Sequence, residues 1–368
     1  MNSGDCAAKG VRTRPNIPEE FPSMTSLSVV ITTIQSPTPS VRALADRLAG
    51  TGAEILIIGD RKGPAVYDLQ GTRLVTIEEQ AESSFALAPL LPENHYGRKN
   101  LGYLMAHREG APCIYETDDD NAPGPTWIER SERLPLADLE QACAAVATST
   151  DVPADRWLNV FRLFCDPPIW PRGFPLDLVH EEVATTPGVG AGETVAPIQQ
   201  GLVDGEPDVD ALWRLLMPRT VDFQVRPSVV VPPGAWCPFN SQSTWWWPSA
   251  YALMYLPCYS SFRMTDIWRS FVAQRCLWEL GHGVVFHAPE VVQERNPHDL
   301  MRDFRDEVPG YEGNRAIVRA LADLNLDAGE SSVADNVMRC YERLVADGFL
   351  PADELPLVRA WVQDVQAD

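Results

Sequence analysis

A succession of strand-like and helix-like segments in the first third of the chain, ending in three adjacent aspartates, most constrains the fold. Residues 27–34 (LSVVITTI) form a continuous apolar, β-branched run, which is typical of a strand buried on both faces. A helix pattern over 41–48 and a second apolar run over 53–58 follow. Further segments of the same kinds are a strand over 73–77, a helix over 99–107 and a strand beginning at Cys113. This alternation predicts an α/β fold whose mixed, mainly parallel sheet is flanked by helices and binds ligands at strand carboxyl ends.

The aspartates Asp118, Asp119 and Asp120 end the last strand of this series and are followed by Asn121. Adjacent like charges repel one another, so a fold keeps them most readily where a cation or solvent relieves the repulsion. Because side chains alternate along an extended chain, Asp118 and Asp120 should point to the same side. Such a pair suits a hard divalent ion, Mn²⁺ or Mg²⁺, that also holds a diphosphate. The alternative is a solvated acidic turn.

Two common phosphate-binding motifs do not occur in the sequence. No GxGxxG follows the first strand, where residues 32–35 read TTIQ, and no GxxxxGK[ST] occurs anywhere. These motifs hold phosphates with a glycine-rich loop. Without them, we expect a carboxylate-bound metal and side chains to hold the ligand.

Composition excludes several classes of partner. The formal net charge of -21 argues against nucleic acid and anionic membrane surfaces, because phosphate contacts need clustered Lys and Arg. No stretch reaches the roughly 18–20 apolar residues of a membrane span, and no secretory signal is visible. The eight cysteines include no CxxC pair, which favours reduced thiols and a cytoplasmic location. Residues 1–24 are polar and contain prolines, and we expect them to form a disordered tail.

Several unusual strings occur in the same order as in a known family. They are 97–103 (GRKNLGY), 114–123 (IYETDDDNAP), 170–175 (WPRGFP), 200–210 (QGLVDGEPDVD), 265–269 (TDIWR) and 293–300 (QERNPHDL). With these strings the chain resembles the STELLO-type glycosyltransferases and, more distantly, the reversibly glycosylated polypeptides that act as UDP-arabinopyranose mutases. The resemblance implies a GT-A fold, a nucleotide-sugar donor and a divalent cation. We therefore expect a GT-A domain over residues 25–304, and the helical pattern beyond it predicts a helical extension over 305–368.

Five residues are expected to bind the donor. Thr33 and Asp60 end the first two strands, where a GT-A fold would hold the nucleoside, although strand termination and turn hydrogen bonding are the ordinary alternatives. Lys99 stands at a helix start, where it could meet a sugar diphosphate together with the positive helix end, or could be a solvated lysine. Asp119 is expected beside the sugar. Asp204, which lies in one of the matched strings, is assigned to the donor as well.

Two residues are candidates for catalysis. Asp266, in the first turn of an expected helix, either complements the helix dipole or, as the family string implies, faces the acceptor as a general base. Arg172 could hold phosphate with its planar guanidinium or stack on Trp170. In the mutase relatives the arginine of the equivalent string becomes glycosylated, but Trp170 and Pro171 depart from the mutase string.

His298 is expected to be the third metal ligand, and His287 and Gln293 are rivals for that role. Together these features predict metal-dependent transfer of a sugar from a nucleotide sugar, which we expect to be UDP-linked, to the hydroxyl group of an acceptor. The acceptor could be a glycan, a lipid-linked molecule or a small molecule. The alternatives are a nucleotide-sugar mutase and a non-catalytic scaffold. The C-terminal helices could serve as an acceptor module or as a surface for a homo-oligomer.

Overall fold

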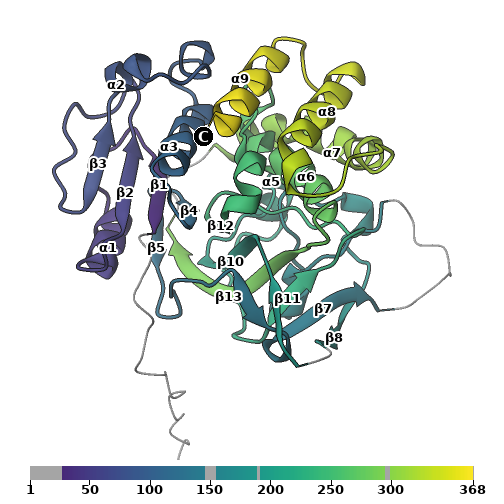
Figure 1. The fold of residues 1–368 in the computed structure, drawn as a ribbon. Helices are drawn as coiled ribbons and strands as arrows, with labels where there is room; N and C mark the ends of the chain where they lie inside the picture. Colours follow the sequence, from purple (N-terminus) through teal and green to yellow (C-terminus); the bar gives the residue numbers. More distant parts are fainter. Residues whose placement is uncertain (1–26, 146–154, 189–190, 295–298, 368) are drawn as a thin grey trace, which may run out of the picture.

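The computed structural model describes residues 27–145, 155–188, 191–294 and 299–367, which fold around one mixed β-sheet (Figure 1). The expected tail over 1–24 lies outside the described residues. The strands are β1 (Ser28–Thr32), β2 (Glu54–Ile58), β3 (Thr72–Val75), β4 (Ile114–Thr117), β5 (Asn121–Pro123), β6 (Arg133–Pro135), β7 (Leu139–Ala144), β8 (Val183–Pro187), β9 (Glu193–Val195), β10 (Ile198–Gly205), β11 (Ser228–Val231), β12 (Ser243–Trp246) and β13 (Val284–Gln293). The α-helices are α1 (Pro39–Leu48), α2 (Ile77–Glu82), α3 (Lys99–Arg108), α4 (Phe161–Phe164), α5 (Ala211–Leu216), α6 (Thr265–Trp278), α7 (Leu300–Ala322), α8 (Val333–Ala346) and α9 (Glu354–Gln366).

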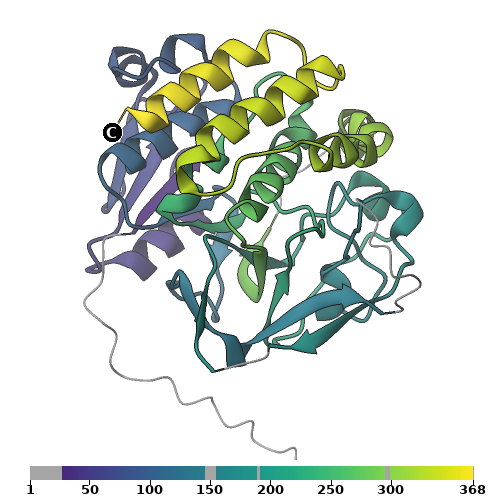
Figure 2. The same ribbon diagram turned by 45° about the vertical axis from the view of Figure 1, so that its right-hand side comes forward.

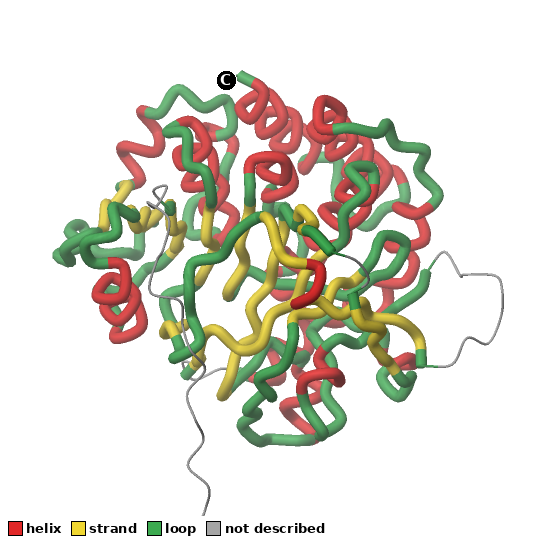
Figure 3. Tube along the Cα trace, turned by 60° about the horizontal axis from the view of Figure 1, so that its bottom comes forward, coloured by secondary structure: helices red, strands yellow, loops and turns green. Residues whose placement is uncertain are grey.

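The main sheet follows the order β3-β2-β1-β4-β12-β10-β13-β11-β7-β8, and β5 pairs with β13. Strands β3, β2, β1 and β4 are parallel, as the alternation of strands and helices predicts. Strand β12 then pairs antiparallel with both β4 and β10, so the strand direction changes directly beside β4. Figure 3 shows the strands in the middle of the molecule with helices around them. The predicted α/β class, with a mixed sheet flanked by helices, is therefore confirmed.

Local sequence explains why the first elements form. Strand β1 is buried on both faces, because Val30 packs in one apolar cluster and Ile31 in another on the opposite side of the sheet. Helix α1 begins at Pro39, whose ring presets the helical backbone, and the Thr38 side chain caps a backbone N–H of the first turn. The strand and the helix expected for this part of the chain are both present.

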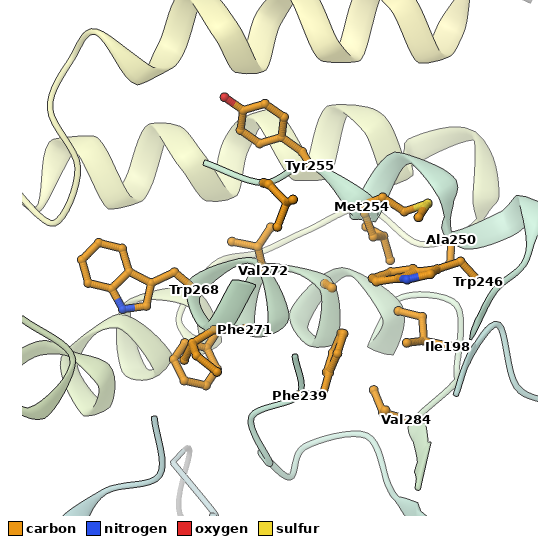
Figure 4. Packing of buried hydrophobic residues seen from close by; sticks show 14 of the residues in the cluster. Ile198, Phe239, Trp246, Ala250, Met254, Tyr255, Trp268, Phe271, Val272 and Val284 are labelled. Carbon is orange, nitrogen blue, oxygen red and sulfur yellow. The ribbon is translucent and has the colours of Figure 1, made fainter. Parts of the chain in front are cut away.

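Helix α6 lies at the centre of the larger core. All its residues from Thr265 to Leu277 are buried. In Figure 4, Phe271 and Val272 point in opposite directions from the helix into surrounding apolar residues. Helices α8 and α9 pack over this region (Figure 2), and Trp361 of α9 belongs to the same apolar cluster as Phe271. The predicted helical C-terminal region is therefore confirmed, and it is packed onto the core of the sheet and α6.

Two further properties bear on the expectations from composition. Within the described ranges, no helix combines the length and the apolar character that crossing a membrane requires. The seven cysteines in these ranges are free thiols, and six of them are buried. Burial raises the pKa of a thiol, as it does for Cys237, to about 12, so such thiols are poor nucleophiles at neutral pH.

Candidate functional site

A cavity of about 240 Å³ lies at the carboxyl end of β4. It is formed where segments far apart in the sequence meet: the ends of β1, β4 and β13, the loop before β12 and the start of α6. The lining residues are Thr32, Tyr96, Asp118, Asp119, Asp120, Arg172, Asp208, Ser241, Gln242, Phe262, Arg263, Asp266 and Gln293. The three adjacent aspartates thus share one cavity with both candidates for catalysis. This position, where the strand direction changes, is the usual ligand site of open α/β sheets.

Asp118 is held by side chains from the start of α3 and the turn before it. Its Oδ1 accepts hydrogen bonds from Lys99 Nζ at 2.8 Å and from the Tyr96 hydroxyl at 2.9 Å. Lys99 Nζ also donates to the Thr117 carbonyl at 2.7 Å, and its side chain is fully buried. Lys99 is not one of the lining residues. In the structure Lys99 is bonded to Asp118, and its contact with a diphosphate therefore stays a prediction.

Lys99 also belongs to a buried network of charged and polar side chains around Glu116. The Glu116 carboxylate accepts hydrogen bonds from Arg269 Nη1 at 2.8 Å, from Trp246 Nε1 at 3.0 Å and from the Tyr103 hydroxyl. Lys99 Nζ lies 4.0 Å from the same carboxylate. A buried carboxylate is stable only where cations and donors surround it. This network joins β4 to α3 and α6, and it thereby fixes the strand end that carries the aspartates.

Asp119 is joined to the end of β1. Its Oδ2 accepts a hydrogen bond from the Thr33 hydroxyl, which itself accepts one from Gln35 N at 2.9 Å. Burial raises the pKa of the Asp119 carboxyl above its ordinary value; the Thr33 bond opposes this shift and the Asp118 charge adds to it. Thr33 and Asp119, both predicted to bind the donor, are therefore neighbours.

Asp120 lies beside two glutamine side chains that are hydrogen-bonded to each other, one from β13 and one from the loop before β12. Gln293 Nε2 donates to Asp120 Oδ2 at 2.8 Å, and Gln242 Nε2 donates to Gln293 Oε1 at 2.8 Å. Gln242 Oε1 is buried and has no hydrogen-bond partner among the described residues. Gln293, a rival for the third metal ligand, therefore lies beside Asp120. An unpaired buried oxygen at this wall indicates that the wall can accept a further donor or a cation.

The oxygens of this wall suit a divalent cation. Mg²⁺ and Mn²⁺ prefer carboxylate and carbonyl oxygens, and Mg²⁺ at phosphate sites commonly uses one or two protein carboxylates with phosphate and water as the other ligands. In the part of the chain that the structure describes, no group of three or more His, Cys, Asp or Glu side chains could hold a metal ion alone. Asp118 and Asp120 thus fit an ion whose coordination a diphosphate completes.

Arg172 is held between two aspartates on the opposite wall. Its guanidinium donates to Asp208 through Nε at 2.9 Å and Nη2 at 2.8 Å, and to Asp266 through Nη1 at 2.9 Å and Nη2 at 2.8 Å. Burial alone would lower the pKa of Arg172, but the two carboxylates raise it well above its ordinary value. Trp170, the alternative partner of Arg172, donates through Nε1 to Asp210 at 2.6 Å. The Arg172 guanidinium group, which was expected to hold phosphate, is thus hydrogen-bonded to carboxylates.

A second arginine extends this ion-pair array. Arg263 donates through Nε to Glu307 of α7 at 3.0 Å, and its Nη2 lies 3.7 Å from Asp208 Oδ1. Glu307 in turn accepts from the backbone N–H of Ala211 at 2.7 Å, where α5 begins. The array therefore connects α5, α6 and α7 behind the cavity wall. It keeps Asp266 in one orientation, because Asp266 is bonded to Arg172 and lies in the first turn of a buried helix.

Two predicted donor residues lie outside this cavity. Asp60 lines a second cavity, of about 300 Å³, at the ends of β2 and β3, and it accepts hydrogen bonds from Arg61 N at 2.7 Å and His95 N at 3.0 Å. Asp204 lies on β10 and accepts a hydrogen bond from Phe223 N at 2.8 Å. Asp204 thus does not line the cavity that contains Asp119, although the sequence assigned both to one ligand.

The histidine expectations have different outcomes. His298 lies outside the described residues. His287 is fully buried in β13, where its ring is bonded to Ser228 Oγ at 2.7 Å and Gln199 Oε1 at 2.8 Å. Both ring nitrogens are therefore engaged, and burial lowers the pKa of His287 well below its ordinary value, with Arg130 lowering it further. His287 does not line the cavity.

Several lining residues were missed by reasoning from sequence. Asp208 lies in the matched string over 200–210, so its charge and position were a usable signal. Phe262 and Arg263 directly precede the string over 265–269, but nothing in their own pattern indicates a site. Tyr96, Ser241 and Gln242 have no local signal either, because only the fold brings them to the end of β4.

Comparison with known proteins adds relatives over nearly the whole chain. A family model described as STELLO glycosyltransferases matches residues 263–367. The chain is 28% identical over 350 residues to the Arabidopsis thaliana protein named Probable glycosyltransferase STELLO1, and 28% identical over 349 residues to Probable glycosyltransferase STELLO2. Each match covers 92% of this chain and 44% of the relative. The chain thus spans less than half the length of these curated relatives.

Two solved structures show a more distant similarity. Glucosyl-3-phosphoglycerate synthase from Mycobacterium tuberculosis, in complex with Mn²⁺, UDP and glucosyl-3-phosphoglycerate, matches with a TM-score of 0.38 and 13% identity, over 79% of this chain and 80% of that chain. The same enzyme with Mg²⁺ and UDP matches over the same shares with a TM-score of 0.37 and 12% identity. The resemblance to the STELLO glycosyltransferases, which the sequence strings indicate, is confirmed by the match over 263–367 and by the two Arabidopsis relatives.

Proposed function

We propose that this protein is a metal-dependent glycosyltransferase that moves a sugar from a UDP-sugar to an acceptor hydroxyl group. One observation carries the proposal: a single cavity joins three aspartates at a strand end to the buried Asp266–Arg172–Asp208 array. The names of the two Arabidopsis relatives support the reaction class. The choice of UDP rests on the resemblance to the UDP-arabinopyranose mutases.

The side of the cavity that Asp118, Asp119 and Asp120 form, which we call the aspartate wall, would bind the donor. Asp118 and Asp120 would hold a Mn²⁺ or Mg²⁺ ion, which neutralises a diphosphate and stabilises the charge on the leaving group when it is bound. Lys99 positions Asp118, because its ammonium group is bonded both to the Asp118 carboxylate and to the β4 backbone. Asp119 and Thr33 are one bonded unit that can accept hydrogen bonds from hydroxyl groups of the donor.

The part of the cavity formed by Arg172, Asp208 and Asp266 would act on the acceptor. Asp266 would accept the proton of the attacking hydroxyl group at one carboxylate oxygen, while that hydroxyl oxygen bonds to the anomeric carbon of the donor. The bond between this carbon and the phosphate oxygen would break, and UDP would leave with the electron pair. Asp266 Oδ1 already accepts from Arg172 and from Ile267 N, whereas Oδ2 accepts from Arg172 and, over a long 3.4 Å, from Ser241 Oγ. An acceptor hydroxyl group would therefore replace the weak Ser241 bond at Oδ2. Arg172 fixes the plane of the Asp266 carboxylate through two hydrogen bonds. We therefore assign Arg172 to the orientation of the base.

The proposal is tested with purified protein, a set of UDP-sugars and Mn²⁺. We expect calorimetry to detect UDP binding that requires Mn²⁺ and is abolished in Asp120→Asn, because the variant removes one negative ligand and keeps the shape. Asp204→Asn is the matched control, since Asp204 is also a strand-end aspartate but lies away from the cavity. Equal loss of binding in both variants, or binding independent of metal, would contradict the proposal.

Turnover separates the roles of the two walls. Asp266→Asn should reduce release of UDP in the presence of acceptor by about 10²–10⁴-fold and leave UDP affinity unchanged. Incubation of each UDP-sugar without an acceptor then distinguishes a mutase, which would produce a ring isomer of the sugar.

A further inference from the structure

Phe262 is an exposed aromatic residue in a cavity that is otherwise lined almost entirely by polar side chains. Its exposed fraction is 61%, yet its ring forms part of the cavity lining. Binding cavities commonly combine polar groups with an aromatic ring that contacts the apolar part of the ligand. Nothing in the proposed metal or proton chemistry uses this ring.

The ring is mounted on a rigid segment. The Phe262 ring meets the Tyr96 ring edge to face, with centroids 6.0 Å apart. The chain before it is fixed by Glu354 of α9, which accepts a hydrogen bond from Tyr259 N at 2.8 Å, and by Ser261 Oγ, which donates to the Asp306 carbonyl of α7 at 2.5 Å. A ring held in this way loses little conformational freedom when it binds a ligand.

The polar groups beside the ring identify the chemistry of its ligand. Phe262 belongs to a 3₁₀ turn (Phe262–Met264) that leads directly into α6, so it lies four residues before Asp266. Asp266 and Asp208 accept hydrogen bonds, while the cations of this wall, Arg172 and Arg263, are already paired with carboxylates. Three carboxylates, of Asp208, Asp266 and Glu307, surround these two guanidinium groups, so the local net charge is negative and disfavours an anionic ligand. A hydroxyl group, in contrast, can donate to a carboxylate oxygen. The combination suits a neutral, hydroxyl-rich ring with an apolar face.

We infer that Phe262 is the platform on which a sugar ring of the acceptor stacks, so that the acceptor is a neutral glycan. The C–H bonds on one face of the sugar would pack on the electron-rich face of the phenyl ring. Its hydroxyl groups would then turn toward Asp208 and Asp266. The inference rests on the proposed glycosyltransferase function and specifies its acceptor, excluding phosphorylated small molecules and lipid-linked phosphates.

The test is saturation-transfer NMR and calorimetry of the full chain with Mg²⁺ and UDP, titrated separately with glucose 6-phosphate and with neutral trisaccharides of glucose, galactose, mannose and xylose. We expect at least one trisaccharide to bind. Phe262→Ala and Phe262→Leu should bind it about tenfold more weakly, and Phe262→Trp should keep wild-type affinity, because only Trp retains an aromatic face. Tyr259→Ala is the matched control: Tyr259 lies in the same segment with an exposed fraction of 45%, but it does not line the cavity.

Each outcome decides the inference. Binding of a sugar phosphate with no binding of neutral trisaccharides would overturn it, as would an absence of binding by every saccharide. Equal affinity of wild type and Phe262→Ala, or a loss in Tyr259→Ala equal to that in Phe262→Ala, would also overturn it. Metal-dependent UDP binding is measured on the same samples: if it persists, only the acceptor inference has failed, and if it is absent, the proposed function has failed. The melting temperature of each variant confirms that it is folded.

Discussion

Replacing Arg172 with methionine tests the buried ion-pair array directly. The side chains of Arg172, Asp208 and Asp266 are only 6%, 2% and 8% exposed, and one guanidinium serves both carboxylates. Arg172→Met keeps most of the side-chain volume but leaves two buried carboxylates facing each other. Removing one partner of a buried ion pair costs about 3–5 kcal/mol. We expect a loss in this range, because Arg263 lies 3.7 Å from Asp208 and compensates only part of one charge.

The assay is unfolding in urea, followed by the fluorescence of the 11 tryptophans. Arg302→Met is the control, because Arg302 and Asp306 form an exposed pair 3.9 Å apart on α7 and such pairs contribute less than about 1 kcal/mol. Adding Asp208→Asn to Arg172→Met should recover part of the lost free energy of unfolding, since one of the two unpaired charges is removed. A change in Arg172→Met no larger than that in Arg302→Met, or no recovery in the double variant, would refute the reasoning.

Two further changes have defined outcomes. Lys99→Met should weaken Mn²⁺ binding, measured by calorimetry, about tenfold or more, because Asp118 loses the ammonium group that positions it. The control is Lys62→Met at an exposed lysine, which should leave Mn²⁺ binding unchanged. Equal effects of the two variants would contradict the role of Lys99. His287→Gln should make the free energy of unfolding less sensitive to acid. In the folded protein the pKa of buried His287 lies well below 6.5, so the unfolded chain binds the proton first as the pH falls. The free energy of unfolding of the wild type therefore decreases below pH 6.5, by up to about 1.4 kcal/mol per pH unit. Melting temperatures at pH 7.5 and 5.5 check this, and identical pH dependence of both proteins would show that His287 does not titrate on unfolding.

The parts of the fold that depend on local sequence were predictable. The apolar run over 27–34 predicts β1, because a strand buried on both faces needs apolar residues at every position. The place of Asp118 at the end of β4 follows in the same way, since the apolar segment before it ends at the charges. Asp266 in the first turn of α6 was also predictable, because the sequence around it has a helix-start pattern.

The contacts that define the site could not be read from the sequence. Glu116 and Arg269 are 153 positions apart and Arg172 and Asp266 are 94 apart, so their pairing depends on how α6 packs into the core. Lys99 was expected either at a diphosphate, because its charge and the positive helix end could bind an anion, or in water. Its burial depends on the acceptors around it, Asp118 among them, and local periodicity does not show where these lie.

The chemistry of the cavity is the central claim, and a crystal structure of the protein with Mn²⁺ and UDP tests it most directly. The account predicts an anomalous manganese signal at the carboxylates of Asp118 and Asp120, with the diphosphate on the same ion and the cavity open toward Asp266 and Phe262. Nucleotide bound elsewhere in the molecule, or bound in this cavity with no manganese at these two carboxylates, would contradict it.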